Sequence, residues 1–252
     1  MAEKLQREDE TLEDLQLGGL KLLQKKSGFR FGMDSVLLAD FALIRPNDLV
    51  VDFGTGGGIL LLLLIGRGKG ERFFGIEIQP DYCEMAERTM KINHLESQVT
   101  ICCEDAGNAD RLFQPCSVDA IICNPPYGEP GTGLESPFSD RAVARNQSEN
   151  TLISFMKAAF RILKGKGKIH VIYPAAQMFQ MMTVMKACHI EPKHFRLIYP
   201  RMTSPANLVM IEGVKDAKPG LHPMKPLIIF EENQDLTNEL KSIYHIQEQN
   251  LV

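Results

Sequence analysis

Residues 49–58 read Leu-Val-Val-Asp-Phe-Gly-Thr-Gly-Gly-Gly, an apolar run that ends in an aspartate and a glycine-rich turn. The run has the length and the residue types of a buried β-strand. A glycine turn at the end of a strand lets the backbone approach a ligand closely. We therefore expect a nucleotide-like cofactor beside this turn.

Strand-like and helical runs alternate after this turn, which predicts a parallel sheet with helices on both faces. The strand-like runs are residues 49–53, 72–78, 99–103, 118–123 and 168–173, and the helical runs are 58–65, 80–93, 151–163 and 175–188. Two further strand-like runs, 194–199 and 206–213, lie close together and predict an antiparallel hairpin at the sheet edge. A short strand at 227–230 and a helix near 236–245 are expected after them.

The glycine spacing distinguishes two classes of cofactor. Glycines stand at 54, 56 and 58, whereas the dinucleotide fingerprint would need glycine where Ile59 stands. Asp52 could hold the amino group of a methionine moiety, directly or through water, but would repel an anionic diphosphate. Glu77 ends the next strand and could accept hydrogen bonds from both ribose hydroxyls. These residues favour S-adenosylmethionine over a nicotinamide dinucleotide. Asp105 follows the third strand and could accept from the cofactor's adenine or cap a helix or turn.

Asn124-Pro125-Pro126-Tyr127 follows another apolar run and suits the activation of a planar amino group. Such a nitrogen is a poor nucleophile because its lone pair is delocalised. The Asn124 side-chain carbonyl and the Pro125 backbone carbonyl can each accept one N–H, which favours a more tetrahedral nitrogen. The prolines fix φ and remove donors, and stacking of a base on Tyr127 would contribute about 1–3 kcal/mol. A plain turn is the alternative, but the glycine turn upstream favours chemistry.

Length and composition bound the remaining possibilities. The 252 residues fit one principal α/β domain with appended ends. We expect an N-terminal segment with a lid helix at 1–45, the catalytic domain at 46–215 and a C-terminal extension packed on it at 216–252. The longest apolar run, 59–65, is shorter than the roughly 20 residues of a membrane span. The first residues lack the pattern of a signal peptide, so we expect a cytoplasmic protein.

Neither the cysteines nor the histidines form a metal-binding pattern. The six cysteines contain no Cys-x-x-Cys pair, and the six histidines contain no His-x-x-x-His pair. Buried free thiols in a reducing compartment explain the cysteines better than disulfides. We predict no metal site.

The chain resembles class I N-methyltransferases with an Asn-Pro-Pro-Tyr motif and, more narrowly, the bacterial tRNA(Val) adenine-N6 methyltransferase family. The resemblance spans residues 15–213 and is carried by 29–39, 52–58, 75–79, 124–127 and 144–145. It implies the α/β fold of class I SAM-dependent methyltransferases: Rossmann-like, with a mostly parallel seven-stranded sheet and an antiparallel edge hairpin. Relatives often have Ala-Arg-His-Glu where this chain has Ala-Arg-Asn-Gln at 144–147, so no role of a His-Glu pair carries over.

The resemblance also implies which residues form the site. The segment before the first strand would lie over the cofactor, and its residues could equally cap and staple the first helix, with Asp34 capping a helix through Leu43. The predicted cofactor-binding residues are Phe31, Met33, Asp34, Asp52, Gly54, Thr55, Gly56, Gly58, Glu77, Ile78, Asp105, Ala106 and Asn124. The predicted catalytic residues are Asn124, Pro125, Pro126 and Tyr127.

The substrate implied by the resemblance is an adenine in tRNA, the purine beside the anticodon. Net charge is −4, but residues 157–201 contain nine Lys or Arg and one acidic residue. Some of these cations suit a helix C-terminus instead. The candidate RNA-binding residues are Lys25, Lys26, Arg30, Arg141, Arg145, Lys193, Arg196 and Arg201. We expect residues 128–150 to form a loop that closes over the substrate.

Two other functions remain open. The same Asn124 geometry serves methylation of a glutamine side chain in a release factor, although such enzymes usually carry a separate N-terminal helical domain. A non-catalytic RNA-binding module on a methyltransferase fold is the other, against which Asp52, Glu77 and Asn124 all argue. No stable protein partner is expected.

Overall fold

A computed structural model describes residues 5–27, 32–125 and 141–245. Its strands are β1 (Glu10–Asp14), β2 (Lys21–Lys25), β3 (Leu49–Phe53), β4 (Arg72–Glu77), β5 (Val99–Cys103), β6 (Val118–Cys123), β7 (Leu163–Pro174), β8 (Ile190–Tyr199), β9 (Leu208–Lys215), β10 (His222–Pro223) and β11 (Leu227–Ile228). Its helices are α1 (Met33–Phe41), α2 (Ile59–Gly66), α3 (Pro80–Ile92), α4 (Arg141–Ile162), α5 (Met178–Ala187) and α6 (Asn238–Ile243), with 3₁₀ turns η2 (Ala106–Arg111) and η3 (Ala175–Gln177).

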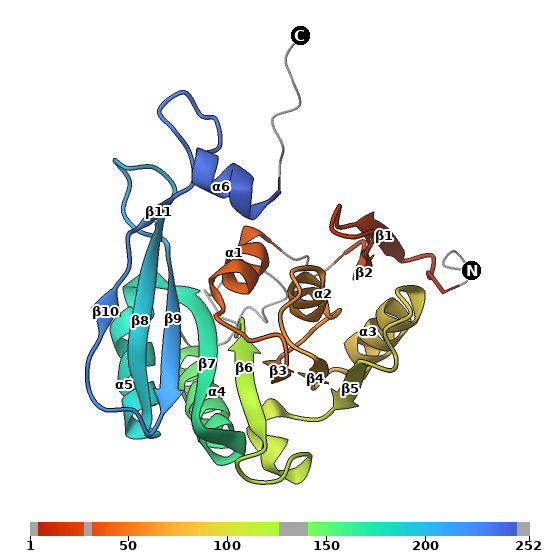
Figure 1. Ribbon diagram of the computed structural model, residues 1–252, viewed down its shortest axis with the longest axis horizontal. Helices are drawn as coiled ribbons and strands as arrows, with labels where there is room; N and C mark the ends of the chain where they lie inside the picture. Colours follow the sequence, from red (N-terminus) through yellow and green to blue (C-terminus); the bar gives the residue numbers. More distant parts are fainter. Residues whose placement is uncertain (1–4, 28–31, 126–140, 246–252) are drawn as a thin grey trace.

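The central sheet has the order β10-β8-β9-β7-β6-β3-β4-β5 within the described residues (Figure 1). Strands β5, β4, β3, β6 and β7 are mutually parallel, and β9 is antiparallel to both β7 and β8. The predicted mostly parallel sheet with an antiparallel pair is confirmed. The sheet has nine strands where seven were predicted, because β10 and β11 each add a two-residue segment beside β8. Strand β11 falls within the short strand predicted at 227–230, whereas β10 is too short to leave a periodic signal in the sequence.

The order of the strands reverses at β3, which pairs with β4 on one side and with β6 on the other. In open α/β sheets, ligands bind outside the carboxyl ends of the strands at such a reversal. The glycine turn follows β3, and Asn124 follows β6. The topology therefore brings the two sequence motifs to the same edge of the sheet.

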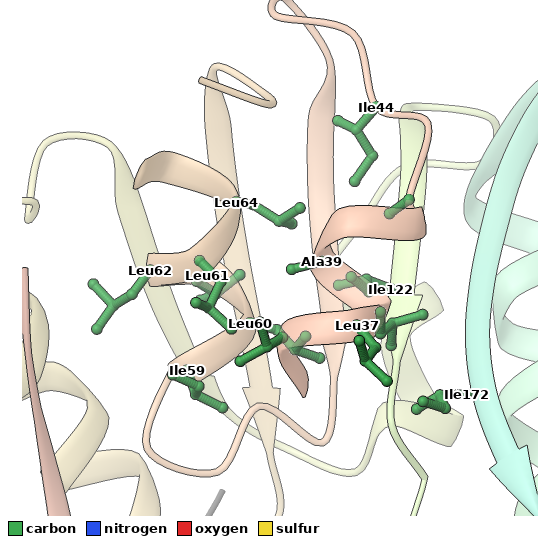
Figure 2. Close-up of a cluster of buried hydrophobic side chains, with 14 of the residues drawn as sticks. Leu37, Ala39, Ile44, Ile59, Leu60, Leu61, Leu62, Leu64, Ile122 and Ile172 are labelled. Atoms are coloured by element: carbon green, nitrogen blue, oxygen red, sulfur yellow. The ribbon is translucent and has the colours of Figure 1, made fainter. Parts of the chain in front are cut away.

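Alternate strand residues face two separate cores. Val50 packs with α1 and α2, whereas Val51 packs with α4 and α5 on the opposite face. Figure 2 shows the first core, where side chains of α1 and α2 meet those of the strands. Helix α2 is apolar all round, as a helix must be when it is covered on every side. Its outer side is covered by the turn between β1 and β2, where Leu17 packs against Gly66.

Strands β1 and β2 form an antiparallel hairpin that the sequence analysis did not anticipate. Three hydrogen bonds fix β2 on α3 and its C-cap Asn93. The Lys21 amide donates to Asn93 Oδ1 at 2.8 Å, Asn93 Nδ2 donates to the Lys21 carbonyl at 2.7 Å, and the Leu23 amide donates to Thr89 Oγ1 at 3.4 Å. Leu22 of this hairpin and Leu240 of α6 belong to the same core as α1 and α2. Both ends of the described chain therefore pack on the central domain, while the boundaries at 45 and 215 stay predictions.

Two predictions about local structure were wrong. Residues 141–150 of the expected substrate loop are instead the first turns of α4. No helix was predicted there because this polar sequence carries no apolar periodicity. Residues 126–140 of that loop lie outside the described residues. Helix α1 is capped by Gly32 and not by Asp34, which lies in the first turn. The other end of α1 is held by Lys69, whose Nζ donates to the carbonyls of Ala39, Asp40 and Ala42 at 2.7–2.8 Å.

None of the helices in the described ranges is both long and apolar enough to cross a membrane.

Candidate active site

A cavity of about 1020 Å³ opens at the carboxyl edge of the sheet. One side is formed by the glycine turn and the end of β4, and the other by residues that follow β6, β7 and the β8–β9 turn. Its lining includes predicted residues from every motif, namely Asp34, Gly54, Thr55, Gly56, Glu77, Ile78, Asp105, Ala106, Asn124 and Pro125. Residues more than ninety positions apart in the sequence are thus gathered around one space.

The glycine turn has the backbone conformation that its sequence predicts. Gly54, Gly56 and Gly58 have φ angles of 76°, 54° and 90°, which side chains other than glycine rarely adopt. The turn is tied to β4, because the amides of Gly54 and Thr55 both donate to the Ile76 carbonyl, at 2.9 and 3.0 Å. A rigid turn of this kind exposes backbone close to the cavity.

Glu77 is held in one orientation by backbone donors. Its Oε2 accepts from the Gly56 amide at 3.0 Å and its Oε1 from the Gln79 amide at 2.9 Å. The side chain is nearly buried yet lines the cavity. Because a carboxylate oxygen has two lone pairs, each oxygen keeps one acceptor site for a ligand. Two adjacent hydroxyls are a suitable partner for this arrangement.

Asp52 is fully buried and lies outside the cavity lining. Neither of its carboxylate oxygens has a hydrogen-bond partner of normal geometry in the described part of the chain. The pKa of Asp52 is raised to about 7, mainly by burial, which the nearby Thr55 hydroxyl partly opposes and to which the charge of Glu77 adds. From the sequence, Asp52 could hold the amino group of the methionine moiety directly or through water. Because Asp52 lies outside the cavity lining, the water-mediated contact remains the prediction.

Asp105 caps the 3₁₀ turn that follows β5 and also borders the cavity. Its Oδ1 accepts from the Gly107 amide at 2.8 Å, which is the capping alternative considered from the sequence. Ala106 is buried beside it, and Ile78 exposes 62% of its surface at the same end of the cavity. An apolar side chain so exposed at a cavity wall offers a surface to a planar ligand.

Asn124 lies at the opposite end, in direct contact with the start of α1. Its Nδ2 donates to Asp34 Oδ2 at 3.0 Å. A carboxylate only accepts hydrogen bonds, so this contact requires the amide nitrogen of Asn124 to face Asp34. The carbonyl oxygen Oδ1 then faces away from Asp34 as an acceptor. Pro125 is buried next to it, while Phe31, Pro126 and Tyr127 lie outside the described residues.

Several cavity residues were not found from the sequence. The wall beside Asn124 includes Thr151, Phe155, Pro174, Asn207 and Leu208, and the wall beside the glycine turn includes Leu22, Leu23, Gln24, Tyr82 and Met85. The first group comes from α4, the end of β7 and the turn before β9. The sequence signal that could have identified these residues is their position at the carboxyl edge of the sheet. The second group comes from β2, which was not predicted, and from α3, which was predicted as a helix without any sign of which side chains face the cavity.

The candidate RNA-binding residues are scattered, and most have partners within the chain. Lys25 is paired with Asp9 at 2.8 Å, and Arg196 with Glu239. Arg201 donates to Gln234 at 2.9 Å and lies in the β8–β9 turn, whereas Lys193 lies toward the opposite end of β8. Lys26 is exposed at the end of β2. Arg30 lies outside the described residues, and Arg141 and Arg145 lie in the first turns of α4.

A search for groups of three or more His, Cys, Asp or Glu in metal-binding arrangement finds none among the described residues.

Comparisons with known proteins give the type of domain and its fold. A family model described as "Methyltransferase domain" matches residues 44–239. A Tolumonas auensis protein named tRNA1(Val) (adenine(37)-N6)-methyltransferase is 27% identical over 179 residues, covering 68% of this chain and 73% of that protein.

Two solved structures show the same fold. A predicted O-methyltransferase from Agrobacterium tumefaciens has a TM-score of 0.69 at 19% identity, covering 84% of this chain and 96% of the other. The structure of M. jannaschii TYW2 in complex with AdoMet has a TM-score of 0.56 at 16% identity, covering 82% and 86%. Both place the order of strands described above among Rossmann-like methyltransferase folds.

Proposed function

Since this chain belongs to the family of methyltransferase domains, we propose that it transfers a methyl group from S-adenosylmethionine to the exocyclic amino group of an adenine in tRNA. The family match supports the methyl transfer and its cofactor. The adenine and the tRNA come from the name of the Tolumonas relative, which specifies adenine 37 of tRNA1(Val). The purine beside the anticodon is therefore the proposed target.

The residues around the cavity fit the cofactor. The two free acceptor sites of Glu77 suit the ribose hydroxyls, and Ile78 with Asp105 suits the adenine ring. When bound, the cofactor supplies a methyl group made electrophilic by a positively charged sulfur. A nearly buried carboxylate and a cavity lining without Lys, Arg or His among the described residues suit a ligand of positive charge.

The observation that carries the proposal is the contact between Asn124 and Asp34 at the cavity. It leaves Asn124 Oδ1 free to accept one hydrogen of an amino group, and the Pro125 carbonyl would accept the other. With both hydrogens held, the nitrogen lone pair is directed out of the ring plane. The target base would leave its stack, at a cost of a few kcal/mol, and Tyr127 would stack against it.

The substitution Asn124→Ala tests this assignment. We expect calorimetry to give cofactor affinity within about twofold of wild type, because Asn124 lies at the far end of the cavity from Glu77. Turnover on tRNA should fall by about 10²–10³-fold, as when one preorganised hydrogen-bonding group is removed from an active site. Asn233→Ala is the matched control, since Asn233 is an exposed amide in the turn before α6. An Asn124→Ala enzyme with most of its activity would contradict the proposal.

The substrate is tested separately by offering tRNA lacking the modification and a release factor to the same enzyme. Methylated adenosine in digested tRNA, detected by mass spectrometry, supports the proposal. Methylated glutamine in the release factor would transfer the activity to protein. A wild-type chain that binds no cofactor would leave a non-catalytic RNA-binding module as the better description.

A further inference from the structure

Gln24, in the middle of the β1–β2 hairpin, carries an amide that the fold does not use. Its side chain is only 5% exposed, and its Oε1 has no hydrogen-bond partner in the described part of the chain. A buried amide oxygen without a partner costs free energy comparable to a lost hydrogen bond. Gln24 nevertheless lines the cavity that holds the glycine turn. A group from a ligand would satisfy the oxygen.

Strand β2 lies directly against the glycine turn. A Cβ atom added to Gly57 would lie 3.1 Å from the Leu23 carbonyl oxygen and 3.2 Å from the Met85 methyl group. The hairpin therefore forms a wall of the cofactor cavity at the point where only glycine lets the backbone approach. Gln24 is the next residue along this wall.

The position of Gln24 identifies the end of the cofactor that it faces. It also lines a second, smaller cavity together with Val36 of α1 and Leu63 of α2, so it stands on the α1 and α2 side of the glycine turn. Ile78 and Asp105, assigned to the adenine ring, follow β4 and β5 on the other side. The glycine turn separates these two ends of the cavity.

The chemistry of an amide matches the groups at the non-adenine end of the cofactor. That end carries an ammonium group, which only donates hydrogen bonds, and a carboxylate, which only accepts them. The Oε1 of Gln24 suits the ammonium and its Nε2 suits the carboxylate. We propose that Gln24 binds the amino-acid end of S-adenosylmethionine. This assignment depends on the proposed cofactor but not on the proposed substrate.

A pair of ligands tests the assignment without any methyl transfer. S-adenosylhomocysteine has the amino-acid end, whereas 5′-methylthioadenosine has the same adenosine and sulfur without it. For Gln24→Met we expect calorimetry to show S-adenosylhomocysteine binding weakened about tenfold or more, as for a lost hydrogen bond to a charged group. Binding of 5′-methylthioadenosine should change by less than about twofold.

Two controls separate this result from damage to the fold. Methionine has a similar length and removes an unpaired polar group, so unliganded Gln24→Met should unfold at the wild-type temperature or above it. Gln114→Met makes the same change at an exposed glutamine outside the cavity lining and should bind both ligands as wild type does.

The outcomes distinguish the two proposals. Equal weakening of both ligands, or of neither, overturns the role of Gln24 while leaving the cofactor assignment intact. A wild-type protein that binds neither ligand overturns the proposed function itself and the role of Gln24 with it.

Discussion

Asp34 and Asn124 are ninety positions apart, yet their contact determines how the amide of Asn124 is oriented. The sequence identified both residues but gave them separate roles, Asp34 over the cofactor and Asn124 at the target. Sequence position cannot show that a carboxylate faces an amide, because that depends on how α1 is placed over β6. The structure supplies that placement through Lys69, which holds the end of α1. Asp34 thereby becomes a candidate positioning residue.

Two substitutions distinguish positioning from cofactor binding. Asp34→Ala frees the Asn124 amide and should lower kcat at saturating cofactor by about 10–100-fold, since small misplacements of a reacting group cost factors of this size. Asp34→Asn can still accept through its own Oδ1 and should retain an intermediate kcat. Cofactor affinity should change less than about threefold in both variants. A raised cofactor dissociation constant with normal kcat at saturation would instead support the lid role.

Other site residues show what position in the sequence can and cannot predict. Glu77 and Asp105 were found because each follows a strand of the sheet, and the structure places both at the cavity. Gln24 was not found because its strand reads Lys-Leu-Leu-Gln-Lys, with no strict alternation of apolar and polar residues. Its buried amide is visible only once the hairpin is folded onto the glycine turn.

At the scale of elements, the hairpin β1–β2 is joined to α3 by an ion pair that is almost entirely buried. Arg88 donates to both oxygens of Glu10 at 2.7 Å, and Glu10 is completely buried while the Arg88 side chain is 12% exposed. Arg88 also donates to both oxygens of Glu84 on its own helix. The hairpin carries Gln24, so the ion pair links the stability of the fold to the shape of the cofactor cavity.

Replacing Glu10 by Gln should therefore affect stability and cofactor binding together. Arg88 keeps Glu84 but loses its buried carboxylate partner, and breaking a buried ion pair costs about 3 kcal/mol, which urea unfolding at pH 7 would measure. Affinity for S-adenosylhomocysteine should fall as well. Glu84→Gln removes a partner that is 41% exposed from the same arginine and should cost only about 0.5 kcal/mol. Equal costs for the two variants would contradict the special role of Glu10.

The same ion pair predicts a pH dependence. Its hydrogen bonds with Arg88 hold the pKa of Glu10 at about 2, below the ordinary value of 4.5. Because the folded pKa is the lower one, the stabilisation is complete above pH 4.5 and is lost as the pH falls toward 2. The difference in unfolding free energy between wild type and Glu10→Gln should therefore shrink across this range.

At the scale of the whole molecule, the sequence predicted the central sheet better than the segments at its periphery. The mostly parallel sheet with an antiparallel pair follows from the alternating strand-like and helical runs and the closely spaced last two strands, and the structure confirms it. Strand β11 falls within the short strand predicted at 227–230, whereas the hairpin β1–β2, strand β10 and the first turns of α4 were missed. Each of these segments is polar or very short, and packing against the central sheet stabilises it more than its own sequence does.

The chain has a net charge of −4, so its overall charge repels the proposed tRNA substrate. A polyanion can bind such a protein only where cations are concentrated and not already neutralised by neighbouring acids. Of the candidate residues, Lys25 and Arg196 are paired with carboxylates, whereas Lys26 is exposed and Arg201 lies in the β8–β9 turn at the carboxyl edge of the sheet, with a neutral partner. Lys26 and Arg201 should therefore contribute most.

Binding of tRNA measured across a range of salt concentrations tests this ranking. The slope of log affinity against log salt concentration changes by about 0.7–0.9 for each phosphate contact. Lys26→Ala and Arg201→Ala should each reduce the slope by that amount, with cofactor affinity unchanged. Lys164→Ala is the control, because Lys164 begins β7 at the opposite edge of the sheet and pairs with Asp119. If Lys164→Ala reduces the slope and Lys26→Ala and Arg201→Ala do not, the RNA binds away from the cavity, and an adenine could not reach Asn124.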